Sequence, residues 1–245
     1  ADLMITGTDG NQISVKAEVE VGDSDDDFLE KFLARTTLTL EPYRQGFRLR
    51  LRTPRDESYQ DEEDSFVRFM RRLFKSGDFH LSFSAEIQVK VPSKQSLDIE
   101  NSYGDIVIEN VNGSLAVRNT SGEVSISRSS GDLDLRNSYA QAEVLDFNGP
   151  VAIRNSSGEV SLKNIAGDVK VQNSYKRVTF EKIGGSLAVD SSSSDVIGIG
   201  VEGDCEVRSS YKEIDVKEVK GTLKIRGDSS SVAVDKVDKD LIIDS

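Results

Sequence analysis

The chain has 245 residues, and 31 Lys and Arg against 43 Asp and Glu give it a formal net charge of −12. This balance argues against nucleic acid as a partner, because binding to phosphates needs clustered positive charge. No stretch approaches the ~20 apolar residues of a membrane-spanning helix, so the chain is not expected to be transmembrane. One cysteine, Cys205, and one histidine, His80, supply neither an intramolecular disulfide nor a set of metal ligands. We therefore expect no metal and no other cofactor.

Residues 1–96 are predicted to form strands and an N-terminal cap, continuous with a regular repeat that follows them. Residues 10–21 alternate apolar and polar side chains and predict a strand, and the sequence TGTDGNQ before it predicts a hairpin turn. Residues 24–36 begin with an N-cap serine and acidic residues and predict a short helix. Residues 36–42 and 46–54 alternate again and predict two more strands.

A basic amphipathic helix is predicted at residues 65–75, after an acidic loop. Two interpretations are open. The helix packs on the flank or end of the repeat, with its arginines facing acidic surface, or it docks on a membrane surface or a partner protein. The residues of this docking-helix hypothesis are Phe66, Phe69, Met70, Arg68, Arg71 and Arg72.

Residues 79–91 alternate once more and lead into a repeat of 18 residues, which begins at Leu97 and occupies residues 97–245 without insertion. Aligned in steps of 18, the same positions carry apolar side chains in unit after unit. The first position of the unit reads Leu97, Leu115, Leu133, Val151, Val169, Leu187, Cys205, Leu223 and Leu241. The tenth reads Ile106, Val124, Ala142, Val160, Val178, Val196, Ile214 and Val232.

This repeat predicts an all-β fold, a single-stranded parallel β-helix in which each 18-residue unit is one coil. Apolar and polar residues alternate within the unit, as in a strand with one buried face. Eighteen residues hold two short strands and two turns, and no helix-length segment separates the strands, so a βαβ arrangement is excluded. Stacked at ~4.8 Å, eight coils would form a rod of about 38 Å. With the N-terminal cap, the fold would contain one or two short helices.

Three further positions in the unit carry expectations about its corners. A glycine recurs at the seventeenth position from Gly113 to Gly221, which predicts a corner with positive φ or close backbone approach. Asparagines from Asn101 to Asn173 predict a turn column whose amides bond one another along the rod. Gly198 interrupts an apolar position and predicts a local bulge or distortion.

Tyrosines occur at one corner of every second coil, and serines take the same position in the coils between. Packing explains this alternation if each ring covers its own turn and the small residue of the next coil. Alternatively, the rings form a surface that stacks against sugars or binds a partner protein. These binding candidates are Tyr103, Tyr139, Tyr175 and Tyr211.

No catalytic residue is singled out. Asp132, Asp168, Asp204 and Asp240 recur two coils apart, about 9.6 Å, which is too far to share a metal ion and repetitive where an active site is singular. Catalytic sequence motifs of hydrolases and metalloproteases are absent. Cys205 replaces leucine at a core position and is expected to be a buried hydrophobe. We expect that the protein is not an enzyme.

The repeats in LDIENSYGDIVIENVNGSLAVRN and LRNSYAQAEV, behind a strand ending AEIQVKVPSKQSLDI, resemble a bacterial family named for adhesins and of unknown function. The resemblance covers roughly residues 80–245 well and 1–79 loosely. It implies a right-handed parallel β-helix, no established catalytic residues, and export to the periplasm or cell surface with a signal peptide removed. The basic helix at 65–75 is a departure from the family pattern. The coil size is also similar to that of bactofilins, which polymerise end to end but lack a large N-terminal cap.

Three functions follow from this sequence. The first is a non-enzymatic cell-envelope or surface scaffold for adhesion or for binding an envelope protein or glycan. The second is a structural scaffold that joins end to end through the C-terminal coil around Ile243. The third is a carbohydrate-active β-helix enzyme, because paired carboxylates on neighbouring coils would satisfy the ~5–9 Å spacing of glycosidases.

Overall fold

A computed structural model describes residues 1–22, 30, 34, 36–43, 46–52, 82–228 and 230–244. The chain divides into two compact units, one formed by Ala1–Lys16 with Ile87–Ser245 and the other by Ala17–Glu86. The chain passes between the units inside strands β2 (Ser14–Gly22) and β5 (Ser82–Pro92).

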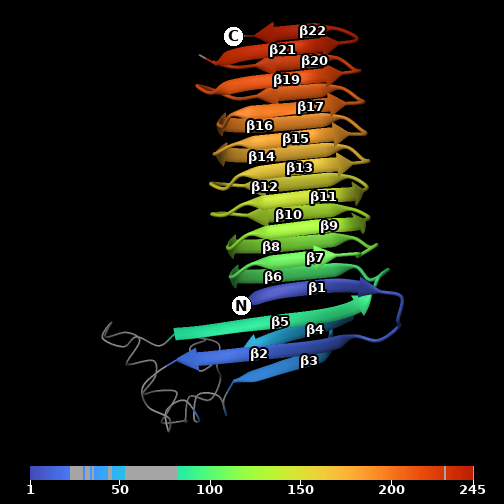
Figure 1. Cartoon of the computed structure of the whole chain (residues 1–245), viewed down its shortest axis with the longest axis vertical. Coiled ribbons are helices and arrows are strands. Elements are labelled where there is room, and N and C mark those ends of the chain that lie inside the picture. The colour runs from blue at the N-terminus through green and yellow to red at the C-terminus, as the bar shows by residue number, and fades with distance from the viewer. Residues whose placement is uncertain are drawn as a thin grey trace. The chain divides into compact units, whose positions relative to one another are not determined.

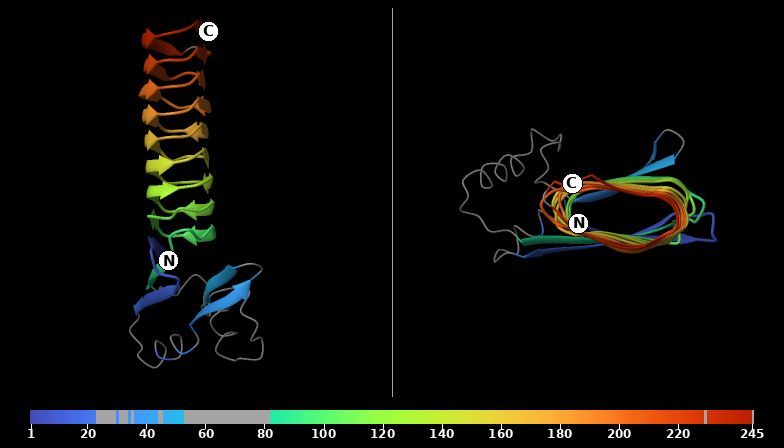
Figure 2. Two further views of the ribbon diagram at one scale, coloured as in Figure 1. Left: turned by 90° about the vertical axis from the view of Figure 1, so that its right-hand side faces the viewer. Right: turned by 90° about the horizontal axis from the view of Figure 1, so that it is seen from above.

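The larger unit is an all-β parallel solenoid of about eight turns, as the repeat predicts (Figure 1). Each turn contributes one strand to each of two sheets, and from above the turns superpose as a flattened loop (Figure 2). The first sheet contains β1 (Asp2–Thr8), β7 (Ile106–Glu109), β9 (Val124–Ser130), β11 (Ala142–Asn148), β13 (Val160–Ile165), β15 (Val178–Ile183), β17 (Val196–Val201), β19 (Glu213–Val219) and β21 (Ser231–Val237). The second contains β6 (Leu97–Tyr103), β8 (Leu115–Ser121), β10 (Leu133–Asn137), β12 (Val151–Asn155), β14 (Val169–Tyr175), β16 (Leu187–Ser193), β18 (Cys205–Arg208), β20 (Leu223–Arg226) and β22 (Leu241–Asp244).

From β6 to β22, partner residues in neighbouring strands are 18 apart, so the sequence period is the structural register. In the second sheet, for example, Leu133 lies between Leu115 and Val151. Backbone hydrogen bonds therefore run along the solenoid from each coil to the next. The hand of the coil stays a prediction from the family resemblance.

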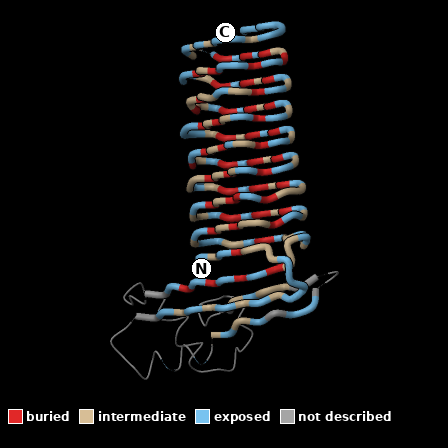
Figure 3. The backbone as a smooth tube through the Cα atoms, turned by 45° about the vertical axis from the view of Figure 1, so that its right-hand side comes forward, coloured by how far each residue is buried: buried red, intermediate tan, exposed pale blue. Residues whose placement is uncertain are grey.

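The inward-facing columns form one continuous core. Ile106, Val117, Leu135 and Val178 are fully buried, and buried residues recur in each of the middle turns (Figure 3). Cys205 is 1 % exposed and lies in the same column as Leu187 and Leu223, which confirms its predicted role as a core residue.

Every coil contains a residue in the left-handed conformation near the end of its first-sheet strand, which the sequence analysis missed. At the fourteenth position of the unit φ lies between 49° and 81° in all eight coils. The strands skip this residue in their pairing, so Leu145 and Phe147 pair with the next coil and Asp146 between them does not. The column consists of Asn110, Arg128, Asp146, Asn164, Lys182, Gly200, Glu218 and Lys236. The kink turns the following side chain inward, and Phe147 and Ile165 are buried there.

The glycine corner depends on close backbone approach. A Cβ added to Gly131 would lie 2.5 Å from the carbonyl oxygen of Gly113, one coil earlier. Gly131 and Gly149 also have positive φ, whereas the other glycines of this column do not. From Gly131 to Gly221 each turn of the corner therefore packs its glycine against the previous one, which leaves no room for a side chain there. The last coil has Lys239 at this position.

The bulge expected at Gly198 is not formed. β17 pairs in continuous register with both neighbours there, and Gly198 lies between Phe180 and Val216. The Phe180 ring fills the volume that a side chain at 198 would take: an added Cβ would lie 2.5 Å from three ring carbons. A large residue in one coil thus compensates for a missing side chain in the next.

The asparagine amides also differ from the expectation, because they do not bond one another. Nδ2 of Asn137 donates to the carbonyl oxygen of Ala140 in its own turn at 2.9 Å and of Gly122 in the preceding turn at 3.2 Å. The equivalent asparagines repeat the pattern, and the Oδ1 atoms of Asn119, Asn137, Asn155 and Asn173 are buried with no hydrogen-bond partner in the described structure. The column clamps successive turns together through their backbone.

The predicted hairpin between β1 and β2 is not formed. The sheet order is β2-β5-β1, so β5 lies between the two strands. The turn sequence predicted that β1 and β2 would be adjacent. Instead β1 lies next to β5, as the hydrogen bond from Thr8 to Val91 shows. In β5 itself Ala85, Ile87, Val89 and Val91 are buried and their neighbours exposed, as the alternation predicts.

In the smaller unit, β3 (Thr37–Tyr43) and β4 (Gly46–Arg52) form an antiparallel pair, which confirms the two predicted strands. Of the helix predicted at 24–36, Glu30 and Ala34 are helical, and most of the segment lies outside the described residues. The predicted helix at 65–75 lies wholly outside them, with Phe66, Phe69, Met70, Arg68, Arg71 and Arg72, as does His80. The boundary proposed at residues 96 and 97 stays a prediction.

Candidate functional site

The four tyrosines of the sequence analysis form a single row, here called the tyrosine row, along one corner of the solenoid. The corner follows the second-sheet strand of each coil, and Tyr103 and Tyr175 are the last residues of β6 and β14. Their backbone partners in the next coil are Ser121 and Ser193. The strand spacing of ~4.8 Å puts successive tyrosines about 9.6 Å apart, since they occur in every second coil.

The rings of the row are largely in solvent. Tyr103, Tyr139, Tyr175 and Tyr211 are 72 %, 68 %, 59 % and 71 % exposed. A ring that covered its own turn would lose most of this surface, so intramolecular packing accounts for only a minor part of each side chain. At Tyr211 the backbone differs from the other three, with φ at 65°.

A column of acidic residues lies beside the tyrosine row. Glu123 and Glu159 are exposed and occupy the coils between Tyr103, Tyr139 and Tyr175. Asp195 follows two coils after Glu159, and its carboxylate lies 3.9 Å from Arg177. A carboxylate therefore occupies each of these three coils between tyrosines.

A shallow, open hollow lies beside Tyr175. Its lining combines Glu159 and Asp195 with Arg177 and Lys212, and its volume is about 400 Å³. The basic residues make this end of the row mixed in charge.

The aspartates at the corners serve the backbone. Oδ1 of Asp168 accepts a hydrogen bond from the N–H of Ser186 at 2.8 Å, and Oδ1 of Asp204 accepts one from Thr222 at 2.8 Å. Asp105, beside the tyrosine row, accepts the N–H of Glu123 in the same way, at 2.8 Å. Each of these carboxylates satisfies a backbone donor of the next coil, which gives Asp105, Asp168 and Asp204 a structural role.

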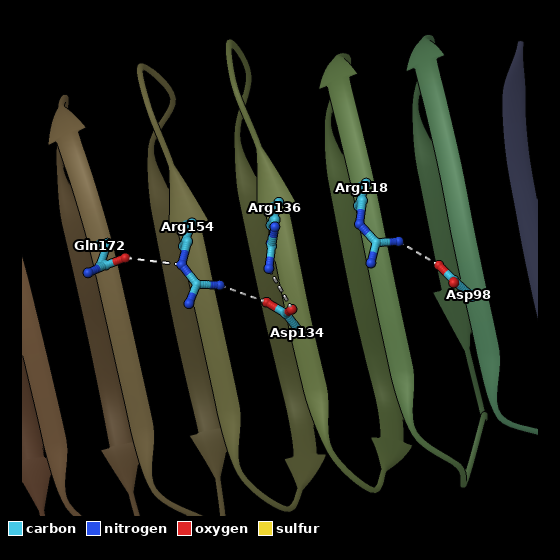
Figure 4. Close-up of polar contacts among 6 residues, drawn as sticks. All are labelled: Asp98, Arg118, Asp134, Arg136, Arg154 and Gln172. Atoms are coloured by element: carbon cyan, nitrogen blue, oxygen red, sulfur yellow. Dashed lines mark hydrogen bonds and ion pairs between the residues drawn. The ribbon is translucent and has the colours of Figure 1, made fainter.

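The outer face of the second sheet carries a ladder of ion pairs that the sequence analysis did not find. Arg154 bridges Asp134 at 3.1 Å and Gln172 at 3.1 Å, and Arg136 also contacts Asp134, at 3.4 Å (Figure 4). Arg118 pairs with Asp98 at 2.7 Å. The feature of the sequence that could have predicted this ladder is the recurrence of arginine every 18 residues, at Arg118, Arg136 and Arg154. These side chains are about half exposed, so each pair contributes only ~0–1 kcal/mol.

The described residues contain no group of three His, Cys, Asp or Glu side chains placed to hold a metal ion. Burial raises the pKa of the Cys205 thiol to about 12, so this residue stays protonated and poorly nucleophilic. Among the described residues, no helix is long and apolar enough to cross a membrane.

The two sheets, the 18-residue coil and the corner columns define a parallel β-solenoid repeat protein. Residues 1–241 match the model of the Toastrack family, DUF4097, and the chain belongs to this family of unknown function. No curated protein and no solved structure matches the chain significantly. The match supports the expected β-helical family of unknown function, while the adhesin role and bacterial origin stay predictions.

Proposed function

We propose that this protein is a non-enzymatic β-solenoid scaffold that binds a partner through the tyrosine row. The observation that carries the proposal is the exposure of four aromatic rings, 59–72 %, at one repeated corner. Monomeric proteins rarely leave aligned aromatic side chains in solvent without a partner.

The scaffold favours binding because it fixes the backbone positions of the tyrosines before the partner arrives. Backbone hydrogen bonds from coil to coil fix the spacing of the corner, and the asparagine clamps bond its turns. A tyrosine side chain also has only two rotatable angles, so little conformational entropy is lost when it is covered.

We place the protein in the periplasm or at the cell surface, with a cell-envelope protein or glycan as its partner. The resemblance of the repeat to exported β-helical proteins supports this location. The structural use of Asp168 and Asp204 favours a scaffold over a carbohydrate-active enzyme. If incubation with acidic polysaccharides lowers their viscosity, the enzymatic alternative prevails.

The test is co-sedimentation of the purified protein with isolated bacterial cell envelopes. We expect the double variant Tyr139→Ser, Tyr175→Ser to sediment much less than the unmodified protein. Ile199→Ser is the matched control, because Ile199 is 40 % exposed and lies on β17, outside the row. Equal sedimentation of the double variant and the control would refute binding through the tyrosine row.

Self-association is the second candidate function. Leu241, Ile242 and Ile243 on β22 are 47 %, 42 % and 44 % exposed, and the columns of Leu241 and Ile243 are buried in the middle coils. Light scattering after size exclusion tests it: the mass would rise with concentration above 26.9 kDa, and Ile243→Asp would prevent the rise. A constant monomer mass over a wide concentration range would refute it.

A further inference from the structure

Taking the tyrosine row as the binding surface proposed above, we propose that its partner is a proline-rich segment in the polyproline II conformation with a basic residue in every turn. The segment would lie along the solenoid axis, with one helical turn for each pair of coils. The proposal rests on three properties of the row: its period, its surface and its flanking charge.

The period of the row matches this conformation. Two coils advance about 9.6 Å, and one turn of polyproline II, three residues at 3.1 Å, advances about 9.3 Å. Over the three intervals from Tyr103 to Tyr211, the row and the peptide differ by only about 1 Å. A β-strand repeats a face every ~6.7 Å. An α-helix approaches the spacing only after two turns, ~10.8 Å, and would be out of step by over 3 Å across the row.

The surface of the row suits a chain of this kind. The exposed rings stand one coil away from Ser121, Ser157 and Ser193, so small residues separate each ring from the next. A proline ring that lies over a serine would contact the faces of the flanking tyrosines. Polyproline II leaves its carbonyl groups without internal hydrogen bonds, and phenol O–H groups are available to donate to them.

The acidic residues beside the tyrosine row favour a basic residue at every third position of the peptide. Glu123, Glu159 and Asp195 recur every 36 residues, in the coils between tyrosines. A lysine or arginine at every third peptide position would meet Glu123 and Glu159 with the same period, whereas Asp195 is already paired with Arg177. Since Lys176, Arg177 and Lys212 gather near Tyr175 and Tyr211, the basic peptide should contact the Tyr103–Tyr139 end most strongly.

The experiment is a calorimetric titration of the full chain with the peptide (Pro-Pro-Lys)₄, whose 12 residues extend about 37 Å and exceed the row of about 29 Å. We expect saturable binding that Tyr139→Ser weakens about tenfold. The double variant Glu123→Gln, Glu159→Gln should weaken it and reduce its dependence on salt. Ile199→Ser should have no effect. Urea unfolding of each variant establishes that it is folded.

Two control peptides separate conformation from charge. (Gly-Gly-Lys)₄ has the same charge without the preformed conformation, and (Pro-Pro-Glu)₄ has the conformation with the opposite charge. Both should bind at least tenfold more weakly. Equal binding of (Gly-Gly-Lys)₄ would overturn the proposal, because the row would then act as a charged surface only.

The remaining outcomes distinguish the failure of this inference from that of the proposed function. If an N-acetylglucosamine hexamer binds, depends on Tyr139, and the peptide does not bind, the row is a glycan surface and the peptide inference is wrong. If neither probe binds but envelope sedimentation still depends on Tyr139 and Tyr175, the inference is also wrong and the proposed function stands. If sedimentation does not depend on them either, both are wrong.

Discussion

The pair of Phe180 and Gly198 predicts a strong energetic coupling between residues 18 positions apart. A methyl group at residue 198 would lie 2.5 Å from three carbons of the Phe180 ring, whereas carbon atoms pack at ~3.5–4.0 Å. The ring is 3 % exposed and has little room to move. Gly198→Ala should therefore lower the free energy of unfolding by about 1–3 kcal/mol, as overpacking does.

The same substitution should be favourable once the ring is removed. Phe180→Ala alone should cost about 3–5 kcal/mol through the cavity it leaves. In that background Gly198→Ala meets no ring and should gain about 0.5–1 kcal/mol, because alanine is more favourable than glycine within a strand. The two effects of Gly198→Ala thus differ by roughly 1.5–4 kcal/mol, which is the coupling energy of the pair.

Urea unfolding followed by circular dichroism measures all four proteins of this cycle. An unchanged dependence of the free energy on urea concentration would show that the unfolding reaction is the same in each. Gly200→Ala is the control, because Gly200 has φ of 81° and its nearest non-neighbouring atoms belong to Lys182. The loss of unfolding free energy caused by Gly200→Ala should be the same with or without the Phe180 ring. An equal cost of Gly198→Ala in both backgrounds would refute the packing argument.

Three further predictions concern single positions. Asn137→Ala should destabilise the fold by about 1–3 kcal/mol, since two turn carbonyls lose their donor; Asn137→Ser should cost less in the same urea experiment, and an equal cost would contradict the clamp. Lys182, at φ 58°, should accept glycine with unchanged or slightly higher stability, whereas Lys182→Val should be less stable than Lys182→Gly by about 1–2 kcal/mol; equal urea midpoints would contradict the strain argument. The thiol of Cys205, whose pKa is raised to about 12 by burial, should react with iodoacetamide at pH 8 only after unfolding; rapid labelling of the folded protein, followed by mass spectrometry, would show that the site is open.

The sequence predicted the coil and its register because every repeat unit has the same length. Because no insertion interrupts the eight units, each residue pairs with its equivalent one coil away, as Leu133 pairs with Leu115 and Val151. The same alignment identified the buried columns, including Cys205, and the corner that bears the tyrosines. It did not identify the arginine ladder of Arg118, Arg136 and Arg154, which emerged only from its ion pairs in the structure.

Other features depend on contacts between coils and have no local signal. Lys182 and Glu218 adopt the left-handed conformation, although nothing in their own side chains favours it. Pairing of the flanking residues with the coils on both sides, as at Leu145 and Phe147, imposes the same path on every coil. Likewise, β5 separates β1 from β2 because pairing with a distant strand outweighs a local turn preference.

The repeat length, the core columns and the glycine corner were thus determined by the amino-acid sequence itself. A position that is buried in every coil requires an apolar or small residue every 18 positions, and this period is visible in the sequence. The tertiary structure alone decided what each column contacts: that Phe180 fills the space above Gly198, that asparagine amides bond carbonyls of two turns, and that the tyrosine rings remain exposed. These outcomes depend on side chains one coil apart, and a distance of 18 residues along the chain becomes direct contact only when the solenoid is formed.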